Sequence, residues 1–263
     1  MRPDGLAYRL HGSGPPIVLI HGDFTNGDLA WAGQVGELSN DFQLVALDRR
    51  GFGASPREPR PYTIASDAAD VLELVAALGL PRFHLIGHSY GGLVALEVAR
   101  TASMPIASLH LIEPPYMALL PDHPDVRRLV DAVRSIFQMD RSLGPEQFAL
   151  AFVSALAGLE AAARTRTRRF WPAIVADAMR GLDAEWPGDY PAAVAAEITI
   201  AGPISVHRGG LSHPGLRAIA GELARILPSA RLIDIDEAGH DVQRSAAPFN
   251  AAFRATIDEL TTG

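Results

Sequence analysis

Short apolar runs alternate with amphipathic stretches along most of the chain. Runs of this kind bounded by turn residues are typical of buried strands, and apolar positions three or four residues apart are typical of helices. Their alternation predicts an α/β fold, with a mostly parallel sheet covered by helices on both faces. The expected strands are 17–20, 43–47, 83–86, 109–112, 204–206 and 231–235, and the expected core helices are 67–78, 92–100, 216–227 and 249–260.

The alternation is interrupted in the middle of the chain. Helical patterns at 126–137, 145–156 and 170–179 follow one another without a convincing strand between them. Expected strands end on both sides of this stretch, so we interpret residues 116–196 as a helical cap, or lid, inserted over the strand ends. Ordinary packing helices are the alternative. Under the first interpretation, residues 1–115 and 197–263 form the core domain.

A serine lies between two glycines where an expected strand gives way to an expected helix. Residues 87–91 read Gly-His-Ser-Tyr-Gly, with Ser89 at the centre. In strand-turn-helix context this G-x-S-x-G pattern is a strong signal for a nucleophile elbow. The tight turn exposes the serine hydroxyl and leaves the N–H of Tyr90 free to stabilise an oxyanion.

Composition narrows the class of protein further. Of the 263 residues 48% are hydrophobic, which is enough for a buried core, and the formal net charge is −7 with the basic residues dispersed. We therefore expect neither nucleic acid nor an anionic membrane as a partner. The absence of a signal-peptide pattern and of a long apolar run makes the cytoplasm the expected location.

Two residue types are missing altogether. The sequence contains neither cysteine nor lysine, which excludes thiol nucleophiles, disulfides, thiolate metal ligands and lysine Schiff bases. The pair His207 and His213 has no matching carboxylates close in sequence, so we expect no metal site. No organic cofactor is implied either.

Four motifs in order give the chain a resemblance to the α/β-hydrolase family over nearly its whole length outside residues 116–196. His21-Gly22 resembles the family's oxyanion loop, and residues 48–55 resemble its D-x-R-G-x-G-x-S turn. Ser89 occupies the elbow, and the Ala-Gly-His sequence at 238–240 resembles the loop that carries the catalytic histidine. The resemblance implies a serine hydrolase, since family members that open epoxides or remove halogens have an aspartate at the elbow.

A serine nucleophile needs a base and an acid that orients the base. His240 is the best base, because it follows the last expected strand behind a flexible Ala-Gly pair. The usual family position for the acid aligns with Ser212, and no carboxylate occurs between residues 198 and 221. There are three explanations: this alignment is shifted, the triad is incomplete, or the acid comes from another part of the sequence. Glu113, at the end of the strand after the one bearing Ser89, is our candidate, with Asp236 in reserve.

The remaining site residues concern the oxyanion and the substrate pocket. Tyr90 N–H is expected to donate to the oxyanion together with Asp23 N–H, or with Phe24 N–H if the loop register differs by one. The Asp23 carboxylate would bring negative charge close to the oxyanion unless it turns away or is paired. That side chain would either slow ester hydrolysis or recognise substrate. Phe24, Tyr116 and Met117 are expected to line the pocket.

The sequence thus predicts a serine hydrolase that cleaves a small or medium carboxylic ester, or a related small-molecule acyl substrate, through an acyl-enzyme. Alternatives on the same residues are carbon–carbon bond hydrolysis of a diketone, lactone opening, acyl transfer and cofactor-free perhydrolysis. A receptor-like ligand-binding protein with little catalysis is the alternative from another class, favoured by the missing aspartate.

Overall fold

A single sheet of seven strands organises the computed structural model, which describes residues 5–57 and 62–258. The strand order is β1-β3-β2-β4-β5-β6-β7; β1 runs antiparallel to β3, and the other neighbours are parallel. The strands are β1 (Tyr8–His11), β2 (Pro16–Ile20), β3 (Gln43–Leu47), β4 (Phe83–His88), β5 (Ile106–Ile112), β6 (Ile204–Gly209) and β7 (Arg231–Ile235).

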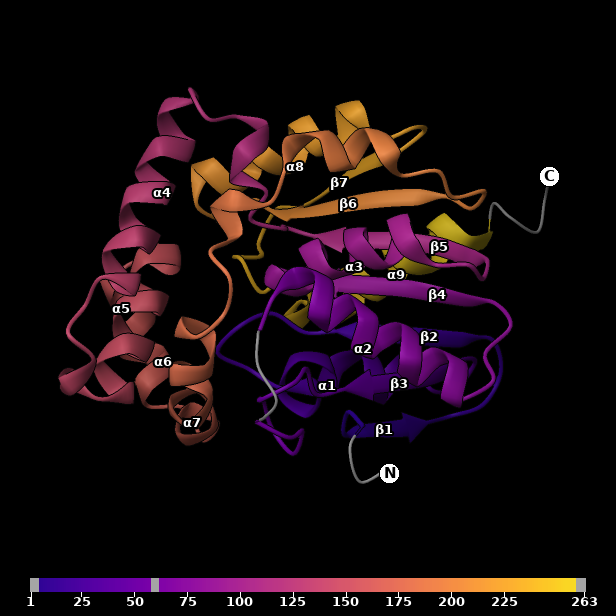
Figure 1. Cartoon of the computed structure of the whole chain (residues 1–263), viewed down its shortest axis with the longest axis horizontal. Coiled ribbons are helices and arrows are strands. Elements are labelled where there is room, and N and C mark those ends of the chain that lie inside the picture. Colours follow the sequence, from indigo (N-terminus) through magenta and orange to yellow (C-terminus); the bar gives the residue numbers. More distant parts are fainter. Residues whose placement is uncertain (1–4, 58–61, 259–263) are drawn as a thin grey trace.

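Helices cover the sheet and extend beyond one end of it. Those of the core are α1 (Gly27–Leu38), α2 (Ile64–Ala77), α3 (Tyr90–Thr101), α8 (Pro214–Ile226) and α9 (Ala246–Asp258). In Figure 1, α2, α3 and α8 lie in front of the sheet and α9 behind it. Separate apolar clusters pack on the two faces. Both faces of a parallel sheet are therefore covered, as the alternating pattern predicts.

Residues 116–196 contain only helical elements and connections. The α-helices are α4 (Pro124–Phe137), α5 (Pro145–Ala157), α6 (Leu159–Arg166) and α7 (Trp171–Leu182). The 3-10 turns are η1 (Met117–Leu119), η2 (Arg141–Leu143), η3 (Pro187–Asp189) and η4 (Ala192–Glu197). The four α-helices lie together at the left of Figure 1 and have an apolar cluster of their own, which includes Phe24 from the core.

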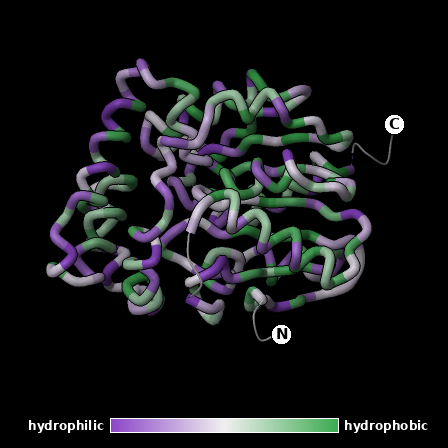
Figure 2. Tube along the Cα trace, viewed as in Figure 1, coloured by the Kyte–Doolittle hydropathy of each residue, from purple (hydrophilic) through white to green (hydrophobic). Residues whose placement is uncertain are grey.

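The central strands are the most deeply buried elements. Every residue of β4 and β5 is buried, and Figure 2 shows hydrophobic positions concentrated along the middle of the sheet. The last residue of β4, His88, pairs with the last residue of β5, Ile112. These two strands therefore end level with each other, and the residues that follow them emerge side by side.

The prediction of an α/β fold is confirmed, with two additions. All the expected strands and core helices are present, whereas β1 and α1 were not predicted from the pattern. The expected last helix reaches residue 260, and its final two residues lie outside the described part of the chain. No helix among residues 5–57 and 62–258 has both the length and the apolar character needed to cross a bilayer.

Candidate active site

Ser89 occupies a strained turn between β4 and α3. Its φ of 53° lies in the left-handed region, which residues other than glycine seldom adopt, and its N–H donates to Ile112 O at 2.8 Å. Gly91 allows the close approach of the neighbouring loop, because a Cβ there would lie 2.4 Å from His21 O. Tyr90 is the first residue of α3, so its N–H precedes the helical hydrogen-bond ladder.

Glu113 occupies a second strained position, directly after β5. Its φ is 42°, its N–H donates to His207 O at 3.1 Å, and its side chain is completely buried. Carboxylate Oε1 accepts the N–H of Gly209 at 2.8 Å. Strand β6 thus holds Glu113 at its backbone and at one carboxylate oxygen, and the other carboxylate oxygen remains for another partner.

That partner is His240. Glu113 Oε2 lies 2.7 Å from His240 Nδ1, and because a carboxylate only accepts, Nδ1 carries the proton and Nε2 is left as the basic nitrogen. Burial alone would lower the pKa of His240, but the hydrogen bond and charge of Glu113, with Asp241 adding to them, outweigh burial and leave that pKa raised. Asp236, the reserve acid, is exposed, and among the described residues it makes no hydrogen bond or ion pair with His240.

His88 supports the loop that carries His240. Its Nε2 lies 3.1 Å from His240 O, to which it donates, and the two rings are 4.9 Å apart. Burial, followed by the positive charge that His240 can take, lowers the pKa of His88 to about 3, so His88 is neutral at pH 7. It therefore positions the loop without competing for the proton that His240 handles.

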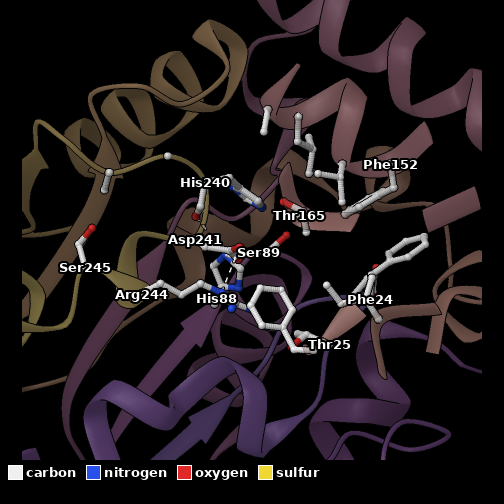
Figure 3. Close-up of a pocket in the computed structure, with 18 of the residues that line it drawn as sticks. Phe24, Thr25, His88, Ser89, Phe152, Thr165, His240, Asp241, Arg244 and Ser245 are labelled. Carbon is white, nitrogen blue, oxygen red and sulfur yellow. Dashed lines mark hydrogen bonds and ion pairs between the residues drawn. The ribbon is translucent and has the colours of Figure 1, made fainter. Parts of the chain in front are cut away.

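A cavity of about 390 Å³ opens in front of these residues. Ser89 and His240 lie on one side of it, and Phe24 and Phe152 on the other (Figure 3). A smaller hollow of about 30 Å³ adjoins it, lined by apolar side chains that include Met117. Both spaces share Ser89, His240, Asp23, Phe24, Phe152 and Leu156.

The pocket residues expected from the sequence fall into two groups. Phe24 and Met117 line the cavities, as expected. Tyr116 does not: it is fully buried in the core, where its hydroxyl donates to Pro191 O at 2.5 Å and accepts the N–H of Ala195 at 3.2 Å. The pocket interpretation of Tyr116 is wrong because the chain turns at Pro114-Pro115 and directs that ring beneath η4 instead.

The Asp23 carboxylate is paired, not isolated. Its Oδ1 lies 2.9 Å from Arg49 Nη1, and Arg49 Nε lies 2.9 Å from Asp67 Oδ2. Burial raises the pKa of Asp23, and the nearby Arg49 and Arg180 oppose that rise. His21 braces the same loop, since its Nε2 accepts the N–H of Arg49 at 2.9 Å.

Two residues that the sequence analysis does not assign to the pocket line the larger cavity. Phe152 on α5 stacks on Phe24 with ring centroids 4.0 Å apart, and Arg244 also lines the cavity. Helical spacing marks Phe152 as apolar but does not show which helix meets the site, and only the fold brings these residues together. Among the described residues, no group of three or more histidine, aspartate or glutamate side chains is arranged to hold a metal ion.

Comparison with known proteins identifies the fold family. The profile of the alpha/beta hydrolase fold matches residues 15–246, and the chain belongs to this family. It is similar to the solved esterase of Thermogutta terrifontis, with 26% identity, a TM-score of 0.70, and coverage of 97% of this chain and 93% of that chain. It is also similar to the enol-lactonase of Burkholderia xenovorans LB400, with 25% identity, a TM-score of 0.70, and coverage of 98% and 96%.

A sequence relative is similar over a shorter stretch. The protein of Caulobacter vibrioides (strain NA1000 / CB15N) named "Putative carbamate hydrolase RutD" is 39% identical over 100 residues, which are 36% of this chain and 37% of that protein. The match thus covers little more than a third of the relative's own length. With the family membership, these names support assignment of the chain as a hydrolase.

Proposed function

We propose that the protein is a serine hydrolase that cleaves a small or medium carboxylic ester, or a related acyl compound, through an acyl-enzyme. The observation that carries the proposal is the 2.7 Å contact between His240 Nδ1 and Glu113 Oε2, on a histidine that lines the same cavity as Ser89. It supplies the acid that the usual family position lacks. It therefore favours an enzyme over a receptor-like protein with an incomplete triad.

The proposed reaction begins with a proton transfer. His240 Nε2 takes the Ser89 proton while Oγ attacks the substrate carbonyl, and Glu113 stabilises the imidazolium that results. His240 then returns the proton to the leaving oxygen as the carbon–oxygen bond breaks. Water repeats the sequence on the acyl-enzyme, with His240 again as base, and releases the acid and free Ser89.

The oxyanion needs two preorganised donors. We assign these to the backbone N–H groups of Tyr90 and Asp23. Tyr90 begins α3, and both residues line the smaller hollow beside Ser89. The Asp23 carboxylate is paired with Arg49, whose positive charge offsets the negative charge of the carboxylate close to the oxyanion.

We assign residues 116–196 as a cap over this site. The support comes from α5, whose side chains Phe152, Val153 and Leu156 line the larger cavity. A small molecule reaching Ser89 would contact α5 on one side and the His240 loop on the other. The cap would thus determine which substrates fit.

Labelling with a fluorophosphonate tests the nucleophile directly. We expect stoichiometric labelling of the wild-type protein, its loss in Ser89→Ala, and Ser89-dependent hydrolysis of p-nitrophenyl acetate. Mass spectrometry locates the adduct. An unlabelled, inactive protein that still binds acyl compounds would overturn the proposal in favour of the receptor-like class.

Lactone opening is the second candidate. It is supported by the similarity to the Burkholderia enol-lactonase, which extends over 98% of this chain. An ester and a lactone would use the same residues, but a lactone keeps its leaving group attached after acylation. Parallel assays on ethyl esters and γ-lactones, each compared with Ser89→Ala, separate the two.

A further inference from the structure

The side chain of Asp23 has one oxygen that nothing in the described structure uses. Oδ1 is held by Arg49 at 2.9 Å, whereas Oδ2 accepts no hydrogen bond from the described residues. Oδ2 is not one of the fully buried polar atoms that lack a partner, so it keeps some exposed surface. Because Asp23 lines both cavities next to Ser89, this oxygen is open to the substrate space.

The charges around Asp23 are already balanced. Arg49 pairs with Asp23 and Asp67 at 2.9 Å each, and Arg180 Nη2 lies 3.5 Å from the other Asp67 oxygen. Two arginines thus face two aspartates in this cluster. The free oxygen therefore does not need a cation for neutrality, and a neutral O–H or N–H donor is enough to satisfy it.

The hollow next to Asp23 is small and mostly apolar. It has a volume of about 30 Å³, which leaves room for one or two small groups, and Asp23 is its one carboxylate among the described lining residues. Its other walls are mainly hydrophobic side chains of the core and cap (Pro115, Met117, Leu129, Val133, Phe137, Leu216). A polar group entering it would lose water and find one strong acceptor.

We propose that Asp23 Oδ2 selects substrates whose acyl part carries a hydrogen-bond donor on the atom attached to the scissile carbonyl. Such acyl groups are α-hydroxyacyl, α-aminoacyl and carbamoyl groups of small size. The inference rests on the proposed function, since it places the acyl part in the smaller hollow beside the assigned oxyanion donors. Asp23 is then a specificity residue through its side chain.

The placement of the acyl part follows from the position of His240. The leaving oxygen must lie on the side of the histidine that protonates it. His240 lines both cavities, but the other residues of its loop (237–239 and 241) line only the larger one, whereas Tyr90 lines only the smaller one. The leaving group therefore extends into the larger cavity, and the acyl group lies next to Tyr90 and Asp23.

The test compares two esters of nearly equal shape. Ethyl lactate carries an α-hydroxyl where ethyl 2-methylpropanoate carries a methyl group, and the ratio of their kcat/KM values measures donor selection. When this ratio is compared between variants, the difference in intrinsic reactivity between the two esters drops out. We expect Asp23→Asn to lower the ratio about 10- to 100-fold, the range for a hydrogen bond to a charged group.

Asp23→Asn is a sharp test because of Arg49. Arg49 only donates, so the amide must turn its oxygen toward Arg49 and its NH₂ toward the substrate. The variant keeps the size of the side chain and the contact with Arg49. It places an NH₂ donor where the carboxylate oxygen stood, and this donor cannot bond a donor of the substrate. Asp23→Ala, which removes the acceptor altogether, is expected to lower the ratio as well.

Glu237→Ala is the control, because Glu237 is an exposed carboxylate that lines only the larger cavity. It is expected to leave the ratio unchanged. If both Asp23 variants slow the two esters equally, Asp23 only braces its loop and the inference is overturned. If no ester is hydrolysed in a Ser89-dependent way, the proposed function itself fails, and the selection by Asp23 fails with it.

Discussion

At the scale of single residues, Glu113 is the position on which the proposed chemistry depends most. Its backbone is strained, its side chain is completely buried, and both of its carboxylate oxygens are hydrogen-bonded. A buried carboxylate is costly unless its hydrogen bonds are complete. Here Gly209 N–H and His240 complete them, so the carboxylate is fixed in the position where it orients the histidine.

Glu113→Gln is expected to reduce turnover of p-nitrophenyl acetate by about 10³- to 10⁴-fold, because an amide next to His240 stabilises the wrong tautomer. Steady-state kinetics measures the loss, and fluorophosphonate labelling shows whether Ser89 remains accessible. Asp236→Asn serves as the control and is expected to retain the wild-type rate. The reverse pattern would move the acid to Asp236.

The raised pKa of His240 makes a prediction about pH. The base form of His240 is lost as the pH falls through its pKa, so the acid limb of kcat/KM is expected above the ordinary histidine value of about 6.5. Removing Glu113 takes away the contacts that raise the pKa. In Glu113→Gln the residual activity should therefore persist to lower pH than in the wild type, as a pH–rate profile would reveal.

At the scale of elements, the three neighbouring strands β4, β5 and β6 share a buried network of histidine and serine side chains. His84 Nδ1, Ser108 Oγ and His110 Nε2 are linked at 2.7 Å each, and Ser205 Oγ continues the chain to His110 Nδ1 at 2.7 Å and to His207 Nε2 at 2.8 Å. Burial lowers the pKa of all three histidines, to about 4 for His84 and about 3 for His207. The network is thus neutral at pH 7 and links side chains of β4, β5 and β6.

Ser205→Ala breaks this hydrogen-bonded network between His110 of β5 and His207 of β6. It leaves a nitrogen of both His110 and His207 without its partner, which is expected to cost about 1–3 kcal/mol in the free energy of unfolding. Urea unfolding followed by circular dichroism measures the loss. The exposed Ser135→Ala is the control, with an expected change within about 0.5 kcal/mol, and an equal effect of both substitutions would contradict the prediction.

The sequence pattern predicts the buried elements better than the marginal ones. β1 was missed because it is an edge strand in which Leu10 is 48% exposed and Arg9 carries a charge, so no apolar run marks it. α1 was missed because its buried face includes Gly27 and Gln34, which obscure the apolar stripe. Glu113 could be predicted because neighbouring parallel strands end near one another, and chain position then places the carboxylate beside the serine turn.

At the scale of the whole molecule, one arginine connects the helices of residues 116–196 to the core. Arg180 on α7 donates from Nε to Arg50 O at 2.6 Å and lies over the rings of Phe52 and Tyr62. It also approaches Asp67, the aspartate that holds Arg49 beside the oxyanion loop. The sequence does not predict this connection, because Arg180 lies more than a hundred residues from each of these partners and only the fold brings them together.

Arg180→Met tests whether this connection stabilises the packing of residues 116–196 against the core. The substitution keeps much of the apolar stem but removes the hydrogen bond to Arg50 O and one of the two arginines near Asp67. Breaking a buried pair in this way is expected to cost about 3 kcal/mol in the free energy of unfolding. Because the lost contacts join α7 to the core, protease cleavage should begin within residues 116–196 under conditions where the core remains intact.

Arg141→Met is the matched control within the same region, because Arg141 pairs with Asp183 at 2.7 Å while its side chain is 51% exposed. Solvent weakens such a pair, so the expected loss is below about 1 kcal/mol, and the cleavage pattern should stay that of the wild type. Urea unfolding and limited proteolysis with mass spectrometry measure both effects. If the two variants behave alike, the buried arginine does not stabilise the packing of residues 116–196 against the core, and the prediction fails.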